Sequence, residues 1–248
     1  MKAMAHSFDI LSANDTEQAK VTVPLDGRAG NGDLRTRREN AVEDEVAKLA
    51  QRVFVLPGSA KAPGAVVFCG VENGAGCSWI CARCAESLAA QVPGSICAVD
   101  VNLRNPSLHR YFHVSQDGGF VEAMRDTRPI ASFARRIGKS NLWVMTSGAT
   151  APEPNGALNP ARLHARFSEL RAQFDYLLID TPAAACFSDA ILLARIADGA
   201  ILVVGSSSTR RESARMVKHN FDAAGVPVLG VVLNKRTYPI PKALYRRL

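Results

Sequence analysis

The sequence contains no apolar run of the roughly 18 residues that a membrane-spanning helix requires. Its most apolar stretch, Ile191–Val204, is interrupted by Arg195 and Asp198. The segment Met1–Leu11 also lacks the continuous apolar core of a signal peptide. We therefore expect a soluble chain that is not secreted.

Cysteine is too sparse for a disulfide scaffold, because only 6 occur among 248 residues, and we expect reduced thiols in a cytoplasm. The hydrophobic share of 47% is enough to fill one sizeable core. The formal net charge of +7 admits nucleic acid, an anionic membrane surface or phosphate ligands as partners. No base-reading element is evident, so no specific nucleic-acid contact is expected.

The first part of the chain differs from the rest. Residues 1–39 show no apolar period of 3.6 or 2 and are predicted to be a flexible extension, whereas residues 40–248 are predicted to form one domain. This domain begins with a helix from Asn40 to about Phe54, with a capping box at its start. A linker, Pro57–Gly64, follows.

Short apolar bursts rich in β-branched residues recur along the rest of the chain, as in strands buried on both faces. They are Ala65–Cys69, Ile96–Val101, Leu142–Thr146, Tyr176–Ile179, Ala200–Val204 and Val228–Leu233. Helical patterns lie between most of them, at Ser78–Gln91, Asn159–Gln173, Ser188–Ile196 and Arg210–Ala224. The alternation predicts an α/β fold with a doubly wound, mainly parallel sheet and helices on both faces. Ligands bind such sheets at the carboxyl ends of the strands.

A glycine-rich segment, Gly70–Ser78, joins the first of these strands to a helix. Such a turn directs backbone N–H groups and the helix dipole at phosphate oxygens. Three residues keep the second half of the pattern G-x-x-x-x-G-K-[ST], namely Gly74, Gly76 and Ser78. The lysine position holds Cys77, and the first glycine position holds Val71. The segment therefore predicts a degenerate phosphate loop of the P-loop NTPase type.

Two aspartates end predicted strands close to this loop. Asp100 follows the second burst, and Asp180 stands before Thr181 and Pro182 at the end of the fourth. Carboxylates at this edge of a parallel sheet commonly hold Mg²⁺ and polarise a nucleophile. The alternative for each is a structural role as a capping carboxylate.

Further segments match one protein family in the same order along the chain. Asp100–Pro106 matches the pattern D-x-D-L-R-x-P, and Asp175–Pro182 matches a Walker B strand. Leu229–Asn234 matches a strand whose asparagine lies near adenine. Weaker matches are Glu45–Gln51, to an oligomerisation helix, and the residues from Pro154 to Ala161, to a P-N-P segment. Together with the phosphate loop, these segments resemble the bacterial tyrosine kinases (BY-kinases), P-loop proteins of the deviant Walker-motif group associated with capsule and exopolysaccharide biosynthesis.

The resemblance implies a site for ATP and Mg²⁺. The residues implied to bind the nucleotide are Gly74, Ala75, Gly76, Cys77, Ser78 and Asn234. The implied metal-binding residues are Ser78, Asp180 and Asp100. The implied catalytic residues are Asp100, Asp180 and Arg104, with Asp100 orienting or deprotonating a tyrosine hydroxyl.

The resemblance also implies partners. The candidate phosphoacceptors are Tyr238 and Tyr245, whose alternative role is to anchor the tail by packing. A membrane-bound polysaccharide chain-length regulator would be the protein partner, and a homo-oligomer is a further expectation. The chain would then be cytoplasmic and peripheral at the inner face of the cell membrane.

Three departures from the family pattern predict an impaired nucleotide site. Cys77 replaces the phosphate-binding lysine, Asn102 replaces a second carboxylate, and Trp79 replaces a small hydroxyl residue. The candidates for a substitute cation are Lys61, Arg104 and an arginine from another subunit. The main alternative function is a non-catalytic scaffold or regulatory partner that keeps the fold without turnover.

Cysteines suggest two other hypotheses. Cys77, Cys81 and Cys84 have the C-x-x-x-C-x-x-C spacing of iron–sulfur ligation in radical SAM enzymes, but they fall within a predicted helix, which favours packing in the core. Cys77 also stands at a helix N-terminus, where the pKa of a thiol can be lowered, although a neutral residue left after the loss of lysine is favoured.

Overall fold

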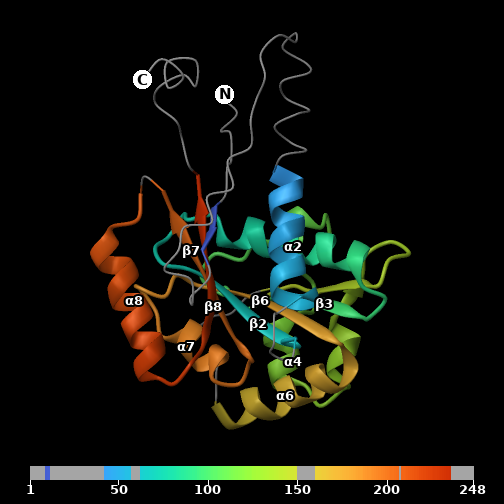
Figure 1. Ribbon diagram of the computed structural model, residues 1–248. Coiled ribbons are helices and arrows are strands. Elements are labelled where there is room, and N and C mark those ends of the chain that lie inside the picture. The colour runs from blue at the N-terminus through green and yellow to red at the C-terminus, as the bar shows by residue number, and fades with distance from the viewer. Residues whose placement is uncertain (1–8, 12–41, 57–61, 150–159, 207, 236–248) are drawn as a thin grey trace, which may run out of the picture.

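The computed structural model describes residues 9–11, 42–56, 62–149, 160–206 and 208–235 (Figure 1). Within these ranges the strands form a single sheet in the order β1-β8-β7-β2-β6-β3-β5-β4. The strands are β1 Asp9–Leu11, β2 Ala65–Gly70, β3 Ile96–Asp100, β4 Arg135–Arg136, β5 Leu142–Met145, β6 Tyr176–Thr181, β7 Gly199–Gly205 and β8 Val228–Asn234. The inner strands are all parallel, and only β1 and β4 at the two edges pair antiparallel. The predicted α/β fold with a mainly parallel sheet is confirmed.

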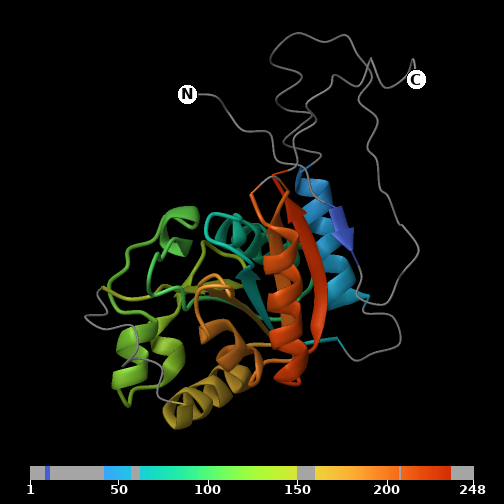
Figure 2. The ribbon, with the colours of Figure 1, turned by 90° about the vertical axis from the view of Figure 1, so that its left-hand side faces the viewer.

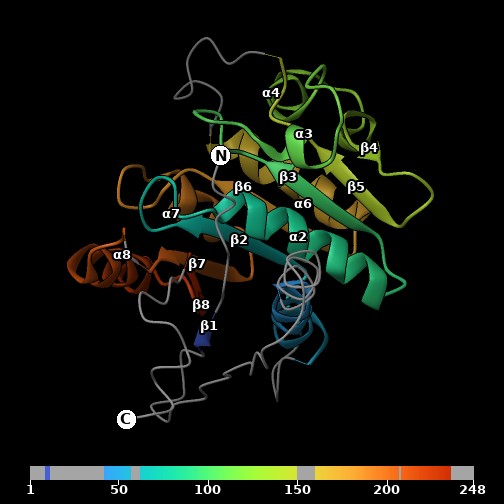
Figure 3. The same cartoon turned by 90° about the horizontal axis from the view of Figure 1, so that it is seen from above.

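Helices cover both faces of this sheet. Their bounds are α2 Cys77–Gln91, α3 Leu108–Tyr111, α4 Phe120–Arg125, α6 Pro160–Gln173, α7 Asp189–Ala194 and α8 Arg211–Ala223, with a short 3-10 turn, η2, at Ile130–Phe133. Figure 3 shows α8 beside β7 and β8 at one end of the sheet and β4 at the other end. The four helices predicted between strands are confirmed to within two residues at each described end.

Alternate side chains of the inner strands build two separate apolar cores. In β2, Val66 and Phe68 face the core formed with α2, α3 and the helix over residues 42–55, whereas Val67 and Cys69 face the core formed with α4, α6, α7 and α8. All four side chains are fully buried. Burial on both faces explains why these strands are continuous apolar runs in the sequence.

The first predicted helix is present over residues 42–50 and continues as a π-helical turn at Gln51–Val55, while Asn40 lies outside the described residues. The segment predicted to be flexible contains a strand, because β1 pairs antiparallel with the exposed edge of β8 (Figure 2). Three residues are too few to show an apolar alternation, so the sequence pattern did not predict this strand. The rest of residues 1–39 lies outside the described part. No described helix has both the length and the apolarity needed to cross a bilayer.

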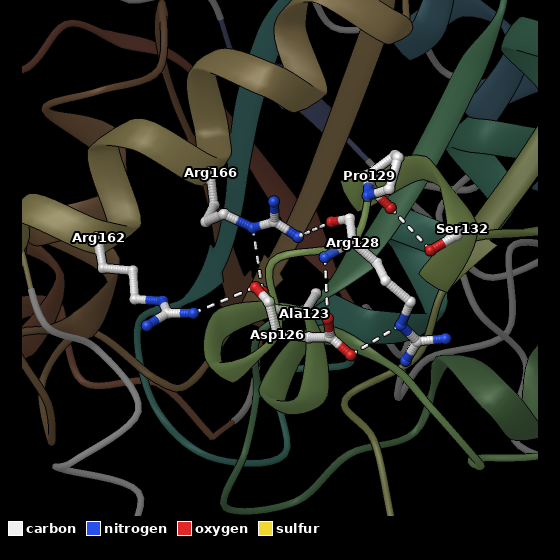
Figure 4. A network of polar contacts seen from close by, with 7 residues as sticks. All are labelled: Ala123, Asp126, Arg128, Pro129, Ser132, Arg162 and Arg166. Atoms are coloured by element: carbon white, nitrogen blue, oxygen red, sulfur yellow. Dashed lines mark hydrogen bonds and ion pairs between the residues drawn. The ribbon is translucent and has the colours of Figure 1, made fainter.

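Two arginines of α6 fix the position of α4, as Figure 4 shows. The buried Arg166 donates hydrogen bonds from Nε to the carbonyl of Ala123 at 3.0 Å and from Nη2 to the carbonyl of Arg128 at 2.9 Å. Arg162 donates to the carbonyl of Asp126 at 3.1 Å. These contacts satisfy carbonyls at and beyond the end of α4, which the helix itself cannot pair. The short helix thus depends on tertiary contacts.

Candidate nucleotide-binding site

The loop between β2 and α2 has the conformation of a backbone cradle. Gly74 and Gly76 have φ angles of 78° and 88°, in the left-handed region that favours glycine. Gly76 caps α2, which begins at Cys77. The free N–H groups of the first turn and the positive end of the helix dipole lie at this loop, where they attract phosphate. Val71, at the missing first glycine, is buried, and its N–H donates to the carbonyl of Val203 at 2.9 Å.

Strand β8 holds the loop from its other side. The amide of Asn234 donates a hydrogen bond to the carbonyl of Ala75 at 2.8 Å and is buried. A Cβ atom at Gly76 would collide with this amide, so a glycine is required there for a packing reason as well. The structure therefore places Asn234 at the phosphate loop, where it positions the loop directly.

The carboxylate of Asp180 lies at the end of β6, beside this loop. The residue is 0% exposed, and neither carboxylate oxygen has a hydrogen-bond partner among the described residues. Burial raises the pKa of Asp180 well above its usual value, and the charge of Asp100 raises it further. The Ser78 hydroxyl and the Cys77 thiol lie close enough to offset part of that rise, although neither makes a hydrogen bond of ordinary geometry. An unpartnered buried carboxylate is costly without a ligand.

Asp100 has a different environment, although it is also fully buried and pairs with Asp180 in the sheet register. Its carboxylate accepts three backbone hydrogen bonds, from Asn102 at 3.1 Å, Ser107 at 2.9 Å and Leu108 at 3.0 Å. Burial raises its pKa to about 6, and the three N–H donors limit the rise. Asp100 thus anchors the start of α3, the capping role that the sequence left open.

Magnesium fits this arrangement at Asp180. Mg²⁺ is usually held by one or two carboxylates together with water and substrate phosphates, and the site offers one carboxylate with both oxygens available beside the Ser78 hydroxyl. Among the described residues, no group of three or more His, Cys, Asp or Glu side chains is arranged to hold a metal by itself. The phosphates of a nucleotide would therefore have to complete the coordination.

Arg104 lies on the flank of the site. Its guanidinium stacks on the ring of Phe187 at 3.8 Å from the centroid, and its Nε lies 3.8 Å from a carboxylate oxygen of Asp189. These contacts join the segment after β3 to the segment after β6. The other candidates, Lys61, Tyr238 and Tyr245, lie outside the described residues.

The three cysteines of the helix do not converge. Cys81 and Cys84 are fully buried in the apolar core between α2 and the sheet, and Cys77 is partly buried at the start of α2. The hypothesis of a lowered thiol pKa at Cys77 is wrong, because burial and the neighbouring Asp180 raise the pKa of the thiol well above its usual value. Their positions along one helix support packing over metal ligation.

Lys235 is a residue of the site that the sequence did not reveal. Its ammonium donates a hydrogen bond to the carbonyl of Gly74 at 2.6 Å. The contact joins residues 161 positions apart in the chain, so no local pattern signals it. The only hint in the sequence is the position of a lysine directly after Asn234, at the carboxyl end of the last strand.

The chain is similar in sequence to bacterial tyrosine kinases. The chain is 27% identical to the tyrosine-protein kinase YwqD of Bacillus subtilis over 145 residues, or 58% of this chain and 61% of the relative. It is 29% identical to CapB of Staphylococcus aureus over 144 residues, or 58% of this chain and 62% of the relative. The chain thus covers less than two thirds of the length of these relatives. It matches no protein-family profile.

Solved structures show the same fold. The kinase domain of the Escherichia coli tyrosine kinase ETK superposes with a TM-score of 0.72 at 21% identity, over 81% of this chain and 79% of that domain. The septum site-determining protein MinD of Pyrococcus horikoshii, solved with Mg-ADP, superposes with a TM-score of 0.56 at 21% identity, over 67% of this chain and 68% of MinD.

The fold and the loop define an α/β protein of the P-loop NTPase type. Within that class, the resemblance to the bacterial tyrosine kinases inferred from the motifs is confirmed by the relatives and by the solved kinase domains.

Proposed function

We propose that this chain is a BY-kinase-like module of capsule or exopolysaccharide biosynthesis or export that binds a magnesium adenine nucleotide at the β2–α2 loop. The observation that carries the proposal is the buried carboxylate of Asp180, which has no hydrogen-bond partner in the described part of the chain and lies beside Ser78 at the start of the phosphate-loop helix. A buried, unpaired carboxylate at this position is stabilised by a cation.

Different residues bind the phosphates, hold the metal, position the loop and orient the acceptor. The N–H groups of Gly74–Ser78 hold phosphate oxygens, and Ser78 and Asp180 hold Mg²⁺, which neutralises phosphate charge when it is bound. Asn234 keeps the loop in position through the carbonyl of Ala75. Asp100 retains lone pairs beyond its three backbone contacts and orients a tyrosine hydroxyl.

Binding is expected to be weaker than in a lysine-bearing P-loop. Removal of one partner of a charge pair costs about 2–5 kcal/mol, which is roughly 30- to 4,000-fold in affinity. Asn102 in place of a carboxylate removes a second charge near the metal. Positioning and charge neutralisation supply most of the catalysis of phosphoryl transfer, so both departures reduce turnover as well.

The wider assignment rests on the resemblance. Tyr238 and Tyr245 are the proposed phosphoacceptors, and a membrane-bound polysaccharide chain-length regulator is the proposed partner. The chain would act in the cytoplasm at the inner face of the membrane, and a homo-oligomer could present the tail of one copy to the site of another.

A second candidate is a scaffold that binds such a partner without catalysis. The observation in its favour is that Asp100 is fully buried and that its carboxylate already accepts three backbone hydrogen bonds, which limits its contact with a tyrosine hydroxyl. A phosphotyrosine blot after incubation with ATP and Mg²⁺ separates the two candidates. Phosphorylation that an Asp100→Ala variant loses supports the kinase, and nucleotide binding without phosphorylation supports the scaffold.

The direct test of the proposed site is calorimetric titration of the wild type and of Asp180→Asn with ATP in the presence and absence of Mg²⁺. The wild type is expected to bind ATP more tightly with Mg²⁺ than without it. Asp180→Asn is expected to lose most of that magnesium effect. A folded wild type that shows no heat at near-millimolar ATP would refute the proposed function.

A further inference from the structure

Lys235 reaches the phosphate loop from the carboxyl end of β8. Its Nζ lies 2.6 Å from the carbonyl oxygen of Gly74, and its Cε would lie 3.8 Å from a Cβ atom at Gly76. Its side chain therefore runs along Gly74 and Gly76, and Gly76 immediately precedes Cys77. A cation is thus present at the loop from which the lysine of the motif is missing.

The backbone of Lys235 is held in an unusual conformation to do this. Its φ angle is 59°, in the left-handed region that side chains other than glycine rarely adopt. Its N–H donates a hydrogen bond to the side-chain oxygen of Asn234 at 2.7 Å, while the amide of Asn234 donates to the carbonyl of Ala75 at 2.8 Å. A maintained departure from ordinary backbone geometry at a site supports a functional role.

The ammonium group has capacity beyond its contact with Gly74. A lysine ammonium carries three donors, and the carbonyl of Gly74 takes one of them. The side chain is only partly buried, so the remaining donors are accessible. A charge at this place lies on the same loop as the N–H groups that would hold phosphate.

We propose that Lys235 supplies the phosphate-neutralising charge that Cys77 does not, so that the cation of this site comes from the end of β8 instead of from the loop itself. The inference rests on the proposed nucleotide binding and adds to it the residue that selects for phosphorylated ligands. It implies that the affinity for adenine nucleotides rises with the number of their phosphate groups, and that this rise depends on Lys235.

The test compares adenosine, AMP, ADP and ATP, each with Mg²⁺, on the wild type, Lys235→Met and Lys235→Arg. Lys218→Met is the matched control, because Lys218 is exposed on α8 and pairs with Asp222. Lys235→Met is expected to lower the affinity for ATP by about tenfold or more, the affinity for ADP by less, and the affinity for adenosine by less than about twofold. Lys235→Arg keeps the charge and is expected to retain most of the ATP affinity, and Lys218→Met to leave all four ligands unchanged.

The outcomes separate the inference from the proposed function. If the wild type binds ATP and Lys235→Met binds it with the same affinity, the role of Lys235 is refuted while the proposed function stands. If Lys235→Met loses affinity for adenosine and ATP equally, Lys235 only stabilises the loop, and the inference is also refuted. A wild type that binds no ATP refutes both. Thermal melting of each variant establishes that it is folded. In a Cys77→Lys background the same Lys235→Met change is expected to cost less, because the loop then carries its own cation.

Discussion

Asp100 and Asp180 are directly opposite one another on β3 and β6, yet within the ranges that the structure describes only the Asp100 carboxylate has hydrogen-bond partners. Asp100 accepts from three backbone N–H groups, whereas no described residue pairs with either buried oxygen of Asp180. Two adjacent acids therefore serve different purposes. The first stabilises the start of α3, and the second is available to a ligand.

This difference predicts opposite effects of the same isosteric change. Without ligand at pH 8, Asp180→Asn should raise the free energy of unfolding by about 1 kcal/mol or more, because it removes a buried carboxylate whose ionisation the folded state disfavours. Asp100→Asn should lower it by about 1–3 kcal/mol, because an amide nitrogen then faces a backbone donor. Urea denaturation measures both. Equal destabilisation by the two changes would contradict the assignment.

The loop glycines predict a second matched pair. Gly76→Ala should cost about 2–3 kcal/mol of stability, since the new Cβ meets the Asn234 amide in addition to a φ of 88°. Gly74 has a φ of 78°, but no atom lies within 4 Å of a Cβ atom added there. Gly74→Ala is therefore expected to cost only about 1 kcal/mol of stability. Thermal and urea unfolding give the comparison, and a smaller loss at Gly76 than at Gly74 would show that the β8 contact is not formed.

Acid stability should depend on Asp198, which accepts hydrogen bonds from the N–H groups of Gly64 and Ala65 and from Arg171, each at 2.8 Å. Burial opposes ionisation, but these donors lower the pKa of Asp198 below its usual value. Because the unfolded chain then takes up a proton more readily, this stability is present above the unfolded pKa and is lost as pH falls through the folded pKa.

Asp198→Asn should therefore lower the free energy of unfolding at pH 7 by about 1 kcal/mol, a modest value because the side chain is 32% exposed. The deficit should shrink as pH falls below 4. Asp222→Asn, at an exposed helical pair with Lys218, is the control and should change little. A deficit for Asp198→Asn that is the same at pH 3 and pH 7 would rule out the charge as its cause.

Alkylation should distinguish the cysteines. Cys186 is exposed, whereas burial and Asp180 raise the pKa of Cys77. Iodoacetamide at pH 8 is expected to modify Cys186 first and Cys77 at least about tenfold more slowly, because the thiolate is the reactive form. Peptide mapping over time gives the rates. Labelling of Cys77 as fast as Cys186 would show an activated thiol after all.

The sequence predicted the parts of the fold that depend on continuous apolar patterns. β2 and β6 are buried on both faces and appear as uninterrupted apolar runs, so their positions and their parallel arrangement could be inferred. The same reasoning brought the phosphate loop and Asp180 to one edge of the sheet. These inferences needed only local composition and the rule that ligands bind at the carboxyl ends of strands.

The sequence did not predict what depends on specific side-chain contacts outside the apolar patterns. α3 and α4 are 4 and 6 residues long, too short for a helical period, and they are fixed by the Asp100 carboxylate and by Arg166. The role of Lys235 depends on a contact with Gly74 across 161 positions. In each case a side chain from elsewhere in the chain decides the local structure.

The most direct test of the nucleotide cradle is to place a lysine in the loop itself, in addition to Lys235. Cys77→Lys, compared with Cys77→Ser as an uncharged control, should raise the affinity for ATP and Mg²⁺ in calorimetry by about tenfold or more, because a lysine there pairs with phosphate. Cys77→Ser should bind as the wild type does. An affinity that is unchanged or weaker in the folded Cys77→Lys variant would contradict the account and would direct attention first to Trp79.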